Sequence, residues 1–242
     1  AIVTVTSYAK DQIAKYSGIE ATKIVPLHIG PKSSITKNEL ETGIDHSLEQ
    51  ILQKKYILHV GTIEKRKNLT TLLAAFELLL QNNLQQLYLV VVGQKSNKPT
   101  LKDDTVFEMV ATSNLLKEHV IFTGYLTDSQ TAILYKHAAL YVFPSVNEGF
   151  GIPILEAFAH KVPVLVAGNS CLPEVAGNAA ICFDPYNADA LSKLIVQTIN
   201  NQALLQSLQQ KGTERLTHFT WDKTVEALEA LFERSIMHAK PQ

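Results

Sequence analysis

Two glutamates that flank a glycine-rich segment form the part of this sequence best suited to chemistry. Glu148 and Glu156 have seven residues between them, and Gly149, Gly151 and Pro153 lie in that interval. The glycines allow a tight turn with open backbone N–H groups, and proline is favoured in the first turn of a helix. A helix that begins there directs its free N–H groups and positive dipole end toward an anion. Each carboxylate can accept hydrogen bonds from the adjacent hydroxyls of a hexose or a ribose.

A basic pair, Arg66 and Lys67, lies earlier in the chain, directly after an apolar segment. Arginine and lysine are the side chains that neutralise phosphates. Sugar-binding carboxylates, a phosphate-binding helix start and a basic pair together predict a site for a nucleotide sugar. The alternative interpretation is a set of solvated charges, two of them favoured by a helix dipole. The glycines between the glutamates favour the interpretation as a binding site over that as solvated charges.

Short apolar segments alternate with helical patterns and must position these residues. The apolar segments are continuous, as is typical of parallel strands covered on both faces. The predicted strands are residues 56–60, 87–92, 119–123, 140–143, 162–166 and 179–183. The predicted helices are residues 69–81, 105–116, 128–137, 153–160, 172–176, 187–211 and 220–237. This succession predicts an α/β fold with a doubly wound parallel (Rossmann-like) sheet, which binds ligands beyond the carboxyl ends of its strands.

The chain divides into three predicted parts. Residues 1–30 form a βαβ remnant with strands 2–6 and 23–28, and Ser7 and Gly18 are expected to cap the helix between them. Residues 31–49 are polar and are predicted to be a linker, and residues 50–242 form the main domain. Because the chain begins directly in a strand, we expect it to be a fragment of a longer protein.

Composition excludes several classes of protein. The 242 residues are 46% hydrophobic and 19% charged, with a net charge of -1, so neither a disordered chain nor nucleic-acid binding is indicated. Neither Cys171 and Cys182 nor the eight histidines form a metal-binding pattern. The sequence has no apolar run of about 20 residues that could span a membrane. We therefore expect a soluble, cytoplasmic protein that uses no metal.

The string Glu-Gly-Phe-Gly-Ile-Pro-Ile-Leu-Glu-Ala, residues 148–157, resembles the signature of family 4 glycosyltransferases. These are retaining enzymes with two Rossmann-like domains, an arrangement called GT-B. Residues 60–68, 170–180 and 183–185 resemble other blocks of that family, and residues 4–10 resemble the last strand-helix unit of its N-terminal domain. The resemblance covers about residues 50–235, the C-terminal, donor-binding half.

The resemblance implies a role for each matching residue. Arg66 and Lys67 would bind the diphosphate and stabilise the departing charge, and Glu148 would hold the transferred sugar as a third catalytic residue. The remaining donor-binding residues would be Gly61, Gly93, Gly124, Tyr125, Leu126, Gly149, Phe150, Gly151, Ile152, Pro153 and Glu156, with Glu156 on the ribose hydroxyls and residues 124–126 beside the base. Many family members carry arginine directly after the first-loop glycine, where this chain has Thr62. That departure leaves Arg66 to supply the second cation.

The predicted function is transfer of a hexose from a GDP- or UDP-linked donor to an acceptor sugar, glycolipid or other alcohol in polysaccharide or glycoconjugate synthesis. The loop at residues 61–68 resembles that of bacterial mannosyltransferases, which favours mannose. The resemblance places the acceptor pocket and the catalytic histidine in the absent N-terminal domain, so this fragment alone is expected to be inactive. It also allows peripheral contact with the inner face of the membrane.

Two other functions compete with this prediction. A non-catalytic nucleotide-sugar-binding module, or half of a split enzyme, would carry the same donor site. An NAD-dependent oxidoreductase is disfavoured because no G-x-G-x-x-G motif follows the first strand of the main domain.

Overall fold

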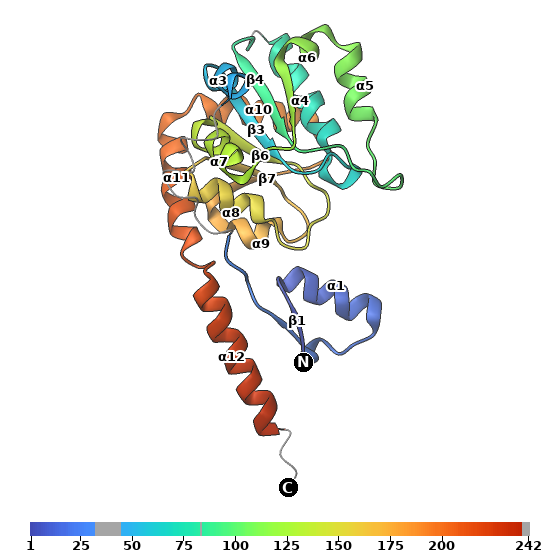
Figure 1. Ribbon diagram of the computed structural model, residues 1–242, viewed down its shortest axis with the longest axis vertical. Coiled ribbons are helices and arrows are strands. Elements are labelled where there is room, and N and C mark those ends of the chain that lie inside the picture. The colour runs from blue at the N-terminus through green and yellow to red at the C-terminus, as the bar shows by residue number, and fades with distance from the viewer. Residues whose placement is uncertain (32–44, 83, 239–242) are drawn as a thin grey trace.

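The computed structural model describes residues 1–31, 45–82 and 84–238 (Figure 1). A sheet covered by helices forms the main body, which occupies the upper part of the view. A small unit made of β1 (Ile2–Thr4), α1 (Ser7–Ser17) and β2 (Ile24–Pro26) lies below it, beside the long last helix, α12 (Trp221–His238).

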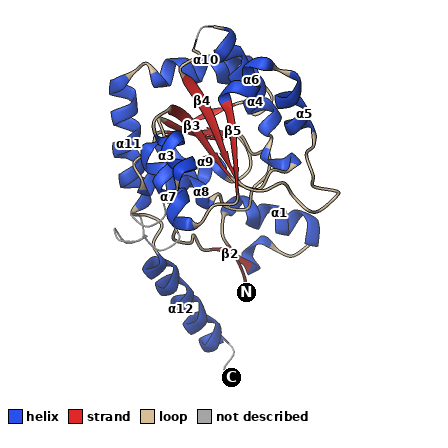
Figure 2. Cartoon of the chain, turned by 45° about the horizontal axis from the view of Figure 1, so that its top comes forward, coloured by secondary structure: helices blue, strands red, loops and turns tan. Residues whose placement is uncertain are grey.

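A six-stranded parallel sheet forms the centre of the main body, with helices around it (Figure 2). Its strands are β3 (Lys55–Val60), β4 (Leu87–Val92), β5 (Val120–Gly124), β6 (Leu140–Phe143), β7 (Val164–Ala167) and β8 (Ala180–Phe183). Every residue of β6 and β7 is buried, which explains why these strands are apolar without alternation. The predicted doubly wound sheet is thus present.

The strand order β5-β4-β3-β6-β7-β8 determines where a ligand can bind. The chain runs outward from β3 through β4 to β5, then returns to the other side of β3 and continues outward from β6. The order therefore reverses between β3 and β6. In open α/β sheets the crevice beyond the carboxyl ends of the strands at such a reversal is the usual ligand site.

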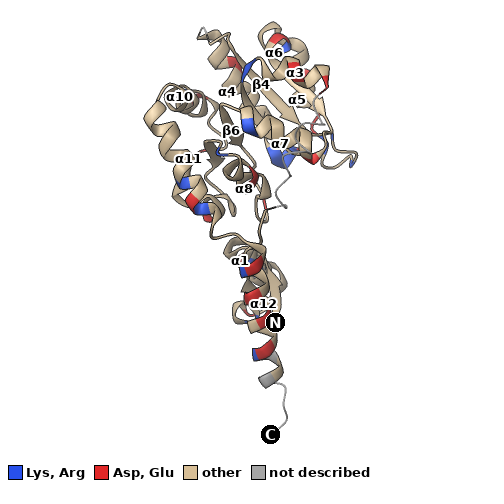
Figure 3. Ribbon diagram, turned by 60° about the vertical axis from the view of Figure 1, so that its left-hand side comes forward, with Lys and Arg blue, Asp and Glu red and all other residues tan. Residues whose placement is uncertain are grey.

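Helices of the main body largely follow the predicted positions. They are α3 (His46–Leu52), α4 (Leu69–Gln81), α5 (Thr105–Thr112), α6 (Asn114–His119), α7 (Asp128–His137), α8 (Ile152–Ala159), α9 (Leu172–Ala176), α10 (Ala188–Ile199) and α11 (Gln202–Leu216). Short 3-10 helices occupy η1 (Ala21–Lys23), η2 (Lys65–Lys67) and η3 (Gly177–Ala179). Lys, Arg, Asp and Glu are interspersed along α11 and α12, in keeping with the balanced composition (Figure 3).

Two predicted helices were wrong because each is divided in two. Ser113 separates α5 from α6 and accepts a hydrogen bond from the Leu116 N–H as the N-cap of α6. Asn201, just after the end of α10, is the N-cap of α11 and accepts a hydrogen bond from the Leu204 N–H. In both places a capping side chain competes with continuation of the helix. The apolar pattern carries no sign of such a break.

The expected linker at residues 31–49 falls mainly on residues 32–44, which lie outside the described residues, and its last residues belong to α3. The division into domains remains a prediction. In the N-terminal unit, β1 and β2 pair in parallel. Thr6 caps α1 by accepting from the Ala9 N–H, so the expectation that Ser7 is the cap was wrong, whereas Gly18 ends the helix in the left-handed conformation as predicted.

Glu174 of α9 connects this small unit to the main body. Its carboxylate accepts from the N–H groups of Ser7 and Tyr8, at the start of α1, and its Oε1 lies 3.0 Å from His28 Nε2. Burial alone would raise the pKa of the Glu174 carboxyl, but these hydrogen bonds outweigh it and the pKa lies below the ordinary value. A carboxylate at the helix start is also favoured by the helix dipole.

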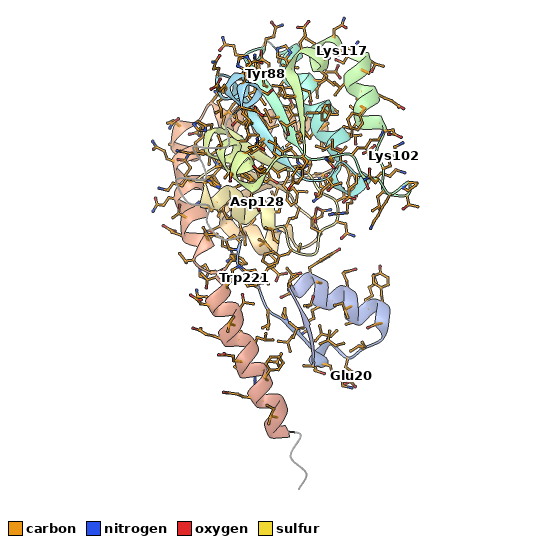
Figure 4. All side chains as sticks on the ribbon, viewed as in Figure 1. Glu20, Tyr88, Lys102, Lys117, Asp128 and Trp221 are labelled. Carbon is orange, nitrogen blue, oxygen red and sulfur yellow. The ribbon has the colours of Figure 1, made fainter. Side chains whose placement is uncertain are left out.

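Trp221, at the point where α12 leaves the main body, makes a further connection (Figure 4). Its indole Nε1 donates to the backbone oxygen of Pro31 over 2.8 Å. Gly30 lies against the same side chain, and a Cβ on this glycine would come within 2.8 Å of the indole. Gly30 and Pro31, which follow the small unit in the chain, therefore pack against Trp221.

Candidate functional site

The basic loop begins where β3 ends and turns back through η2. Arg66 O accepts from the Val146 N–H of the loop after β6, over 2.8 Å. Asn68, in the left-handed conformation, donates from its side chain to the backbone oxygens of Pro144 and Pro185. Because asparagine tolerates this conformation better than most residues, it can end the turn and hold the loop across the sheet reversal.

The predicted catalytic residues form one ionic cluster. Glu148 Oε1 lies 2.7 Å from both Lys67 Nζ and Arg66 Nη1. Arg66 Nε lies 2.6 Å from Glu64 Oε1, and the Glu64 side chain is only 7% exposed. Among the described residues, none hydrogen-bonds Glu148 Oε2. The second oxygen of this carboxylate is therefore available to accept from a ligand hydroxyl.

Lys67 is the buried member of the cluster, with 8% of its side chain exposed. Burial lowers the pKa of its ammonium, and the charge of Glu148 opposes that effect. Its Nζ lies 5.0 Å from the centre of the Phe143 ring, a cation–π contact. His59, buried beneath the loop, has its pKa lowered to about 3 by burial and by the Lys67 charge, so it is a neutral structural side chain.

The glycine-rich turn leads into α8 as predicted. Gly151 has φ of 101°, a conformation that favours glycine, and Pro153 lies in the first turn of the helix. Gly149 O accepts from the Thr6 hydroxyl of the N-terminal unit over 2.9 Å. The Phe150 side chain is buried, and its ring lies 5.9 Å from Phe219, so only its backbone can face a ligand.

Glu156 lies one turn into α8 and lines a pocket of about 670 Å³. Tyr135 of α7 donates its hydroxyl to Glu156 Oε2 over 3.2 Å, and its ring stacks on His160. Burial raises the pKa of the Tyr135 hydroxyl well above its ordinary value, with the Glu156 charge adding to the effect. Tyr135 therefore remains a hydrogen-bond donor that orients this carboxylate.

This pocket lies at the carboxyl ends of β3 and β4, beside the sheet reversal. Its lining includes five of the predicted donor-binding residues, namely Gly61, Gly93, Tyr125, Leu126 and Glu156. Tyr125 is 71% exposed, so its ring is accessible to a ligand. The volume falls in the range typical of small-molecule sites.

Two predicted glycines have structural explanations. A Cβ on Gly93 would lie 2.1 Å from Gly61 O, and its φ is 139°, so this position needs glycine for close approach of two backbone segments. That contact is with the protein itself, whereas sequence reasoning expected approach to the donor. Gly124 O accepts from the Gly93 N–H over 2.9 Å, and Gly124 is not among the residues lining the pocket.

Apart from Gly124, the predicted residues therefore form two neighbouring groups. One lines the Glu156 pocket, and the other is the ionic cluster with the turn from Gly149 to Pro153. Ile152 is partly buried and packs against the core. Sequence reasoning missed Glu64, Tyr135 and Glu174 as parts of the arrangement. Glu64 lies two residues before Arg66, which is a usable signal, whereas the other two are brought in only by tertiary packing.

Within the described ranges, no three His, Cys, Asp or Glu side chains cluster so as to hold a metal ion. No described helix is long and apolar enough to cross the bilayer. The absence of a metal, cytoplasmic location and membrane contact all remain predictions.

Comparison with known families gives a match to glycosyl transferases group 1 over residues 44–215. The chain belongs to this family. The glycosyltransferase family predicted from the sequence is confirmed, as is the fold class of one half of a GT-B enzyme. The match contains the basic loop, both glutamates and the turn between them. The roles of individual residues remain predictions.

Relatives of this group 1 chain include bacterial O-antigen chain mannosyltransferases. It is 30% identical to O-antigen chain mannosyltransferase B of Escherichia coli over 91% of this chain and 57% of that protein. It is 28% identical to O-antigen chain mannosyltransferase RfbU of Salmonella typhimurium over 76% of this chain and 46% of that protein. The chain thus spans about half the length of these relatives.

Solved structures agree on the fold. A glycosyltransferase from Rickettsia africae superposes with a TM-score of 0.76 and 21% identity, over 96% of this chain and 62% of that one. HepE of Anabaena, solved with UDP and glucose, gives a TM-score of 0.78 and 15% identity over the same shares. At these identities the likeness supports the fold of this chain alone.

Proposed function

We propose that this chain is the donor-binding portion of a retaining glycosyltransferase. The whole enzyme transfers a hexose, with mannose favoured, from a GDP- or UDP-linked donor. The acceptor is a sugar, a glycolipid or another alcohol in polysaccharide or glycoconjugate synthesis. An N-terminal Rossmann-like domain completes the enzyme. The mannosyltransferases among its relatives support the choice of sugar.

The observation that carries the proposal is the position of the ionic cluster beside the Glu156 pocket, at the reversal of the sheet. The pocket can hold a nucleoside, with the ribose hydroxyls on Glu156. We infer that the diphosphate then binds at the start of α8 and at Arg66 and Lys67, and that the sugar binds at Glu148. Each part of a nucleotide sugar thus meets the chemical groups suited to it.

In the proposed reaction the bond between the anomeric carbon and the diphosphate oxygen breaks. A bond between that carbon and the acceptor oxygen forms on the same face, and the acceptor proton passes to the leaving diphosphate. Arg66 and Lys67 stabilise the charge that develops on the diphosphate, which is the largest catalytic contribution available to such a site. Glu148 Oε2 accepts from a hydroxyl of the transferred sugar. The step uses neither a metal nor a protein nucleophile.

The test is thermal unfolding of the 242-residue chain with GDP, UDP, ADP, GDP-mannose, UDP-glucose and NAD, each in turn. A ligand that binds only the folded state raises Tm by mass action. We expect GDP or UDP and the matching sugar nucleotide to raise Tm, and the shift to be lost in Glu156→Ala. Glu233→Ala, an exposed glutamate on α12, is the control and should leave the shift unchanged.

Either of two results would overturn the donor-site assignment. One is a shift with NAD and with none of the nucleoside diphosphates. The other is a nucleotide shift of equal size in the wild type and in Glu156→Ala. A binding module without catalysis is the competing function. It would bind donor equally well, yet the chain joined to its N-terminal domain would release no nucleotide from the sugar nucleotide.

A further inference from the structure

Thr6, the N-cap of α1, makes two hydrogen bonds with its hydroxyl. The residue is fully buried, and the hydroxyl oxygen accepts from the Ala9 N–H over 3.1 Å. The same hydroxyl donates to Gly149 O over 2.9 Å, in the turn that leads into α8. Capping a helix requires only an acceptor, which an aspartate or asparagine supplies equally well. The capping role therefore does not explain why the one proton of this hydroxyl is directed at Gly149.

Packing does not fix the backbone of Gly149. A Cβ on this glycine would meet no atom within 4 Å, and the residue is exposed. Glycine also adopts a wider range of backbone conformations than other residues. On the Gly149 side, the orientation of the peptide group that joins it to Phe150 therefore depends on hydrogen bonds. The Thr6 hydroxyl supplies one to the oxygen of that group.

Other backbone oxygens of this loop are held in the same way. Cys171, just before α9, donates its thiol to Glu148 O over 3.1 Å. Burial raises the pKa of this thiol to about 12, so it keeps its proton. Asn169 donates its side-chain amide to Val146 O over 2.6 Å. Side chains from the N-terminal unit and from the segment after β7 thus hold the loop by its backbone oxygens.

The held oxygens determine where the adjacent N–H groups point. A peptide group is planar and trans, so its N–H points away from its own C=O. The Phe150 N–H therefore points away from the Thr6 side chain. The Gly149 N–H points away from the Cys171 thiol in the same way. Among the described residues, neither N–H has a hydrogen-bond acceptor. Fixed, free donors of this kind stabilise an anionic group without having to reorganise.

We propose that Thr6 is a positioning residue of the donor site. It holds Gly149 O so that the Phe150 N–H is directed at the sugar diphosphate of the donor. Because Thr6 is fully buried, it acts through the turn and not by contact with the ligand. The proposal rests on the proposed function, since it concerns the same donor.

This role makes the diphosphate site depend on the N-terminal unit. Glu174 of α9 accepts from the N–H groups of Ser7 and Tyr8, and thereby holds the end of α1 that carries Thr6. Figure 1 shows α1 below the main body, at α9. The turn before α8 therefore has its full set of hydrogen bonds only when α1 lies against the main body.

The test compares Thr6→Val, which removes the hydroxyl at nearly constant shape, with Thr6→Ser, which keeps it. Isothermal titration of the 242-residue chain measures the Kd of the nucleoside, of GDP or UDP, and of the matching sugar nucleotide. We expect Thr6→Val to raise the Kd of the diphosphate and of the sugar nucleotide roughly 2- to 12-fold, the size of one net hydrogen bond. The Kd of the nucleoside should not change, because neither Thr6 nor the turn lines the Glu156 pocket. Thr6→Ser should restore the wild-type values.

Gly18→Ala is the matched control, because Thr6→Val also weakens α1 by removing its N-cap. Gly18 ends the same helix in the left-handed conformation, and a Cβ there would meet no atom within 4 Å. The substitution therefore weakens α1 at its other end and leaves the Thr6 hydroxyl in place. It should leave all three Kd values unchanged.

Three results would overturn the assignment of Thr6 while the donor site stands. One is a diphosphate Kd that is the same in Thr6→Val and in the wild type. The second is equal weakening of diphosphate binding by Thr6→Val and Gly18→Ala. The third is equal weakening of nucleoside and diphosphate by Thr6→Val, which would mean that the hydroxyl serves only the stability of the fold. A wild-type chain that binds no nucleotide would instead refute the proposed function.

Discussion

Lys67→Met is the substitution that most directly tests the ionic cluster. Methionine is unbranched and close to lysine in length, so it can keep the packing against Phe143 while the charge is removed. The ammonium lies 2.7 Å from Glu148 Oε1, and both side chains are about nine-tenths buried. Arg66 still pairs with Glu148 in the variant. The loss of unfolding free energy should therefore stay below the roughly 3–5 kcal/mol of a fully broken buried pair.

The effect on ligand binding should depend on the diphosphate. A hydrogen bond to a charged group contributes roughly 1.5–3 kcal/mol, which is about a 10- to 150-fold change in Kd. We expect Lys67→Met to weaken GDP or UDP binding by that factor and to leave binding of the parent nucleoside nearly unchanged. The Glu156 pocket is the proposed nucleoside site, and Lys67 is not part of its lining.

Isothermal titration of the nucleoside and of its diphosphate measures both quantities. Lys193→Met is the matched control, because Lys193 also pairs with a carboxylate at 2.6 Å but is 70% exposed on α10. That variant should change neither affinity. Equal weakening of nucleoside and diphosphate by Lys67→Met would refute the reasoning, since it would mean that the substitution disturbs the fold of the pocket rather than a phosphate contact.

Three further predictions concern the Glu156 pocket, the close approach of the segments that follow β3 and β4, and the link to the N-terminal unit. Glu156→Ala should weaken nucleotide binding by roughly 1.5–3 kcal/mol in the same titration, and an unchanged Kd for the diphosphate would contradict the ribose assignment. Gly93→Ala should lower the free energy of unfolding in urea by clearly more than the roughly 1–2 kcal/mol expected of Gly124→Ala. Both positions have positive φ, but of the two only Gly93 lacks space for a Cβ. Equal losses would show that the close approach of Gly93 to Gly61 is not tight. The lowered pKa of Glu174 means that its stabilisation is present above the ordinary carboxyl pKa of 4.5 and is lost as the pH falls through the folded-state value. Tm should therefore fall less steeply toward about pH 3 in Glu174→Gln than in the wild type, and parallel curves would contradict this account.

The sequence predicted the sheet well because continuous apolar segments that alternate with helical patterns are typical of parallel strands covered by helices on both faces. It predicted the turn from Gly149 to Pro153 because glycine and proline have specific backbone requirements that local sequence expresses. It did not predict the breaks at Ser113 and Asn201. A capping side chain within an amphipathic pattern ends a helix only where tertiary packing favours the break, and the local pattern does not specify that packing.

The sequence by itself determined the chemical groups of the site: two glutamates, a basic pair and a helix start, each placed after a strand. The reversal of strand order between β3 and β6 then brought them to one edge of the sheet. Only the tertiary structure decided that both cations share one oxygen of Glu148, that Tyr135 orients Glu156, and that Gly93 serves a backbone contact. These contacts join residues far apart in the chain. Their distances follow from how the helices pack on the sheet, which no local pattern specifies.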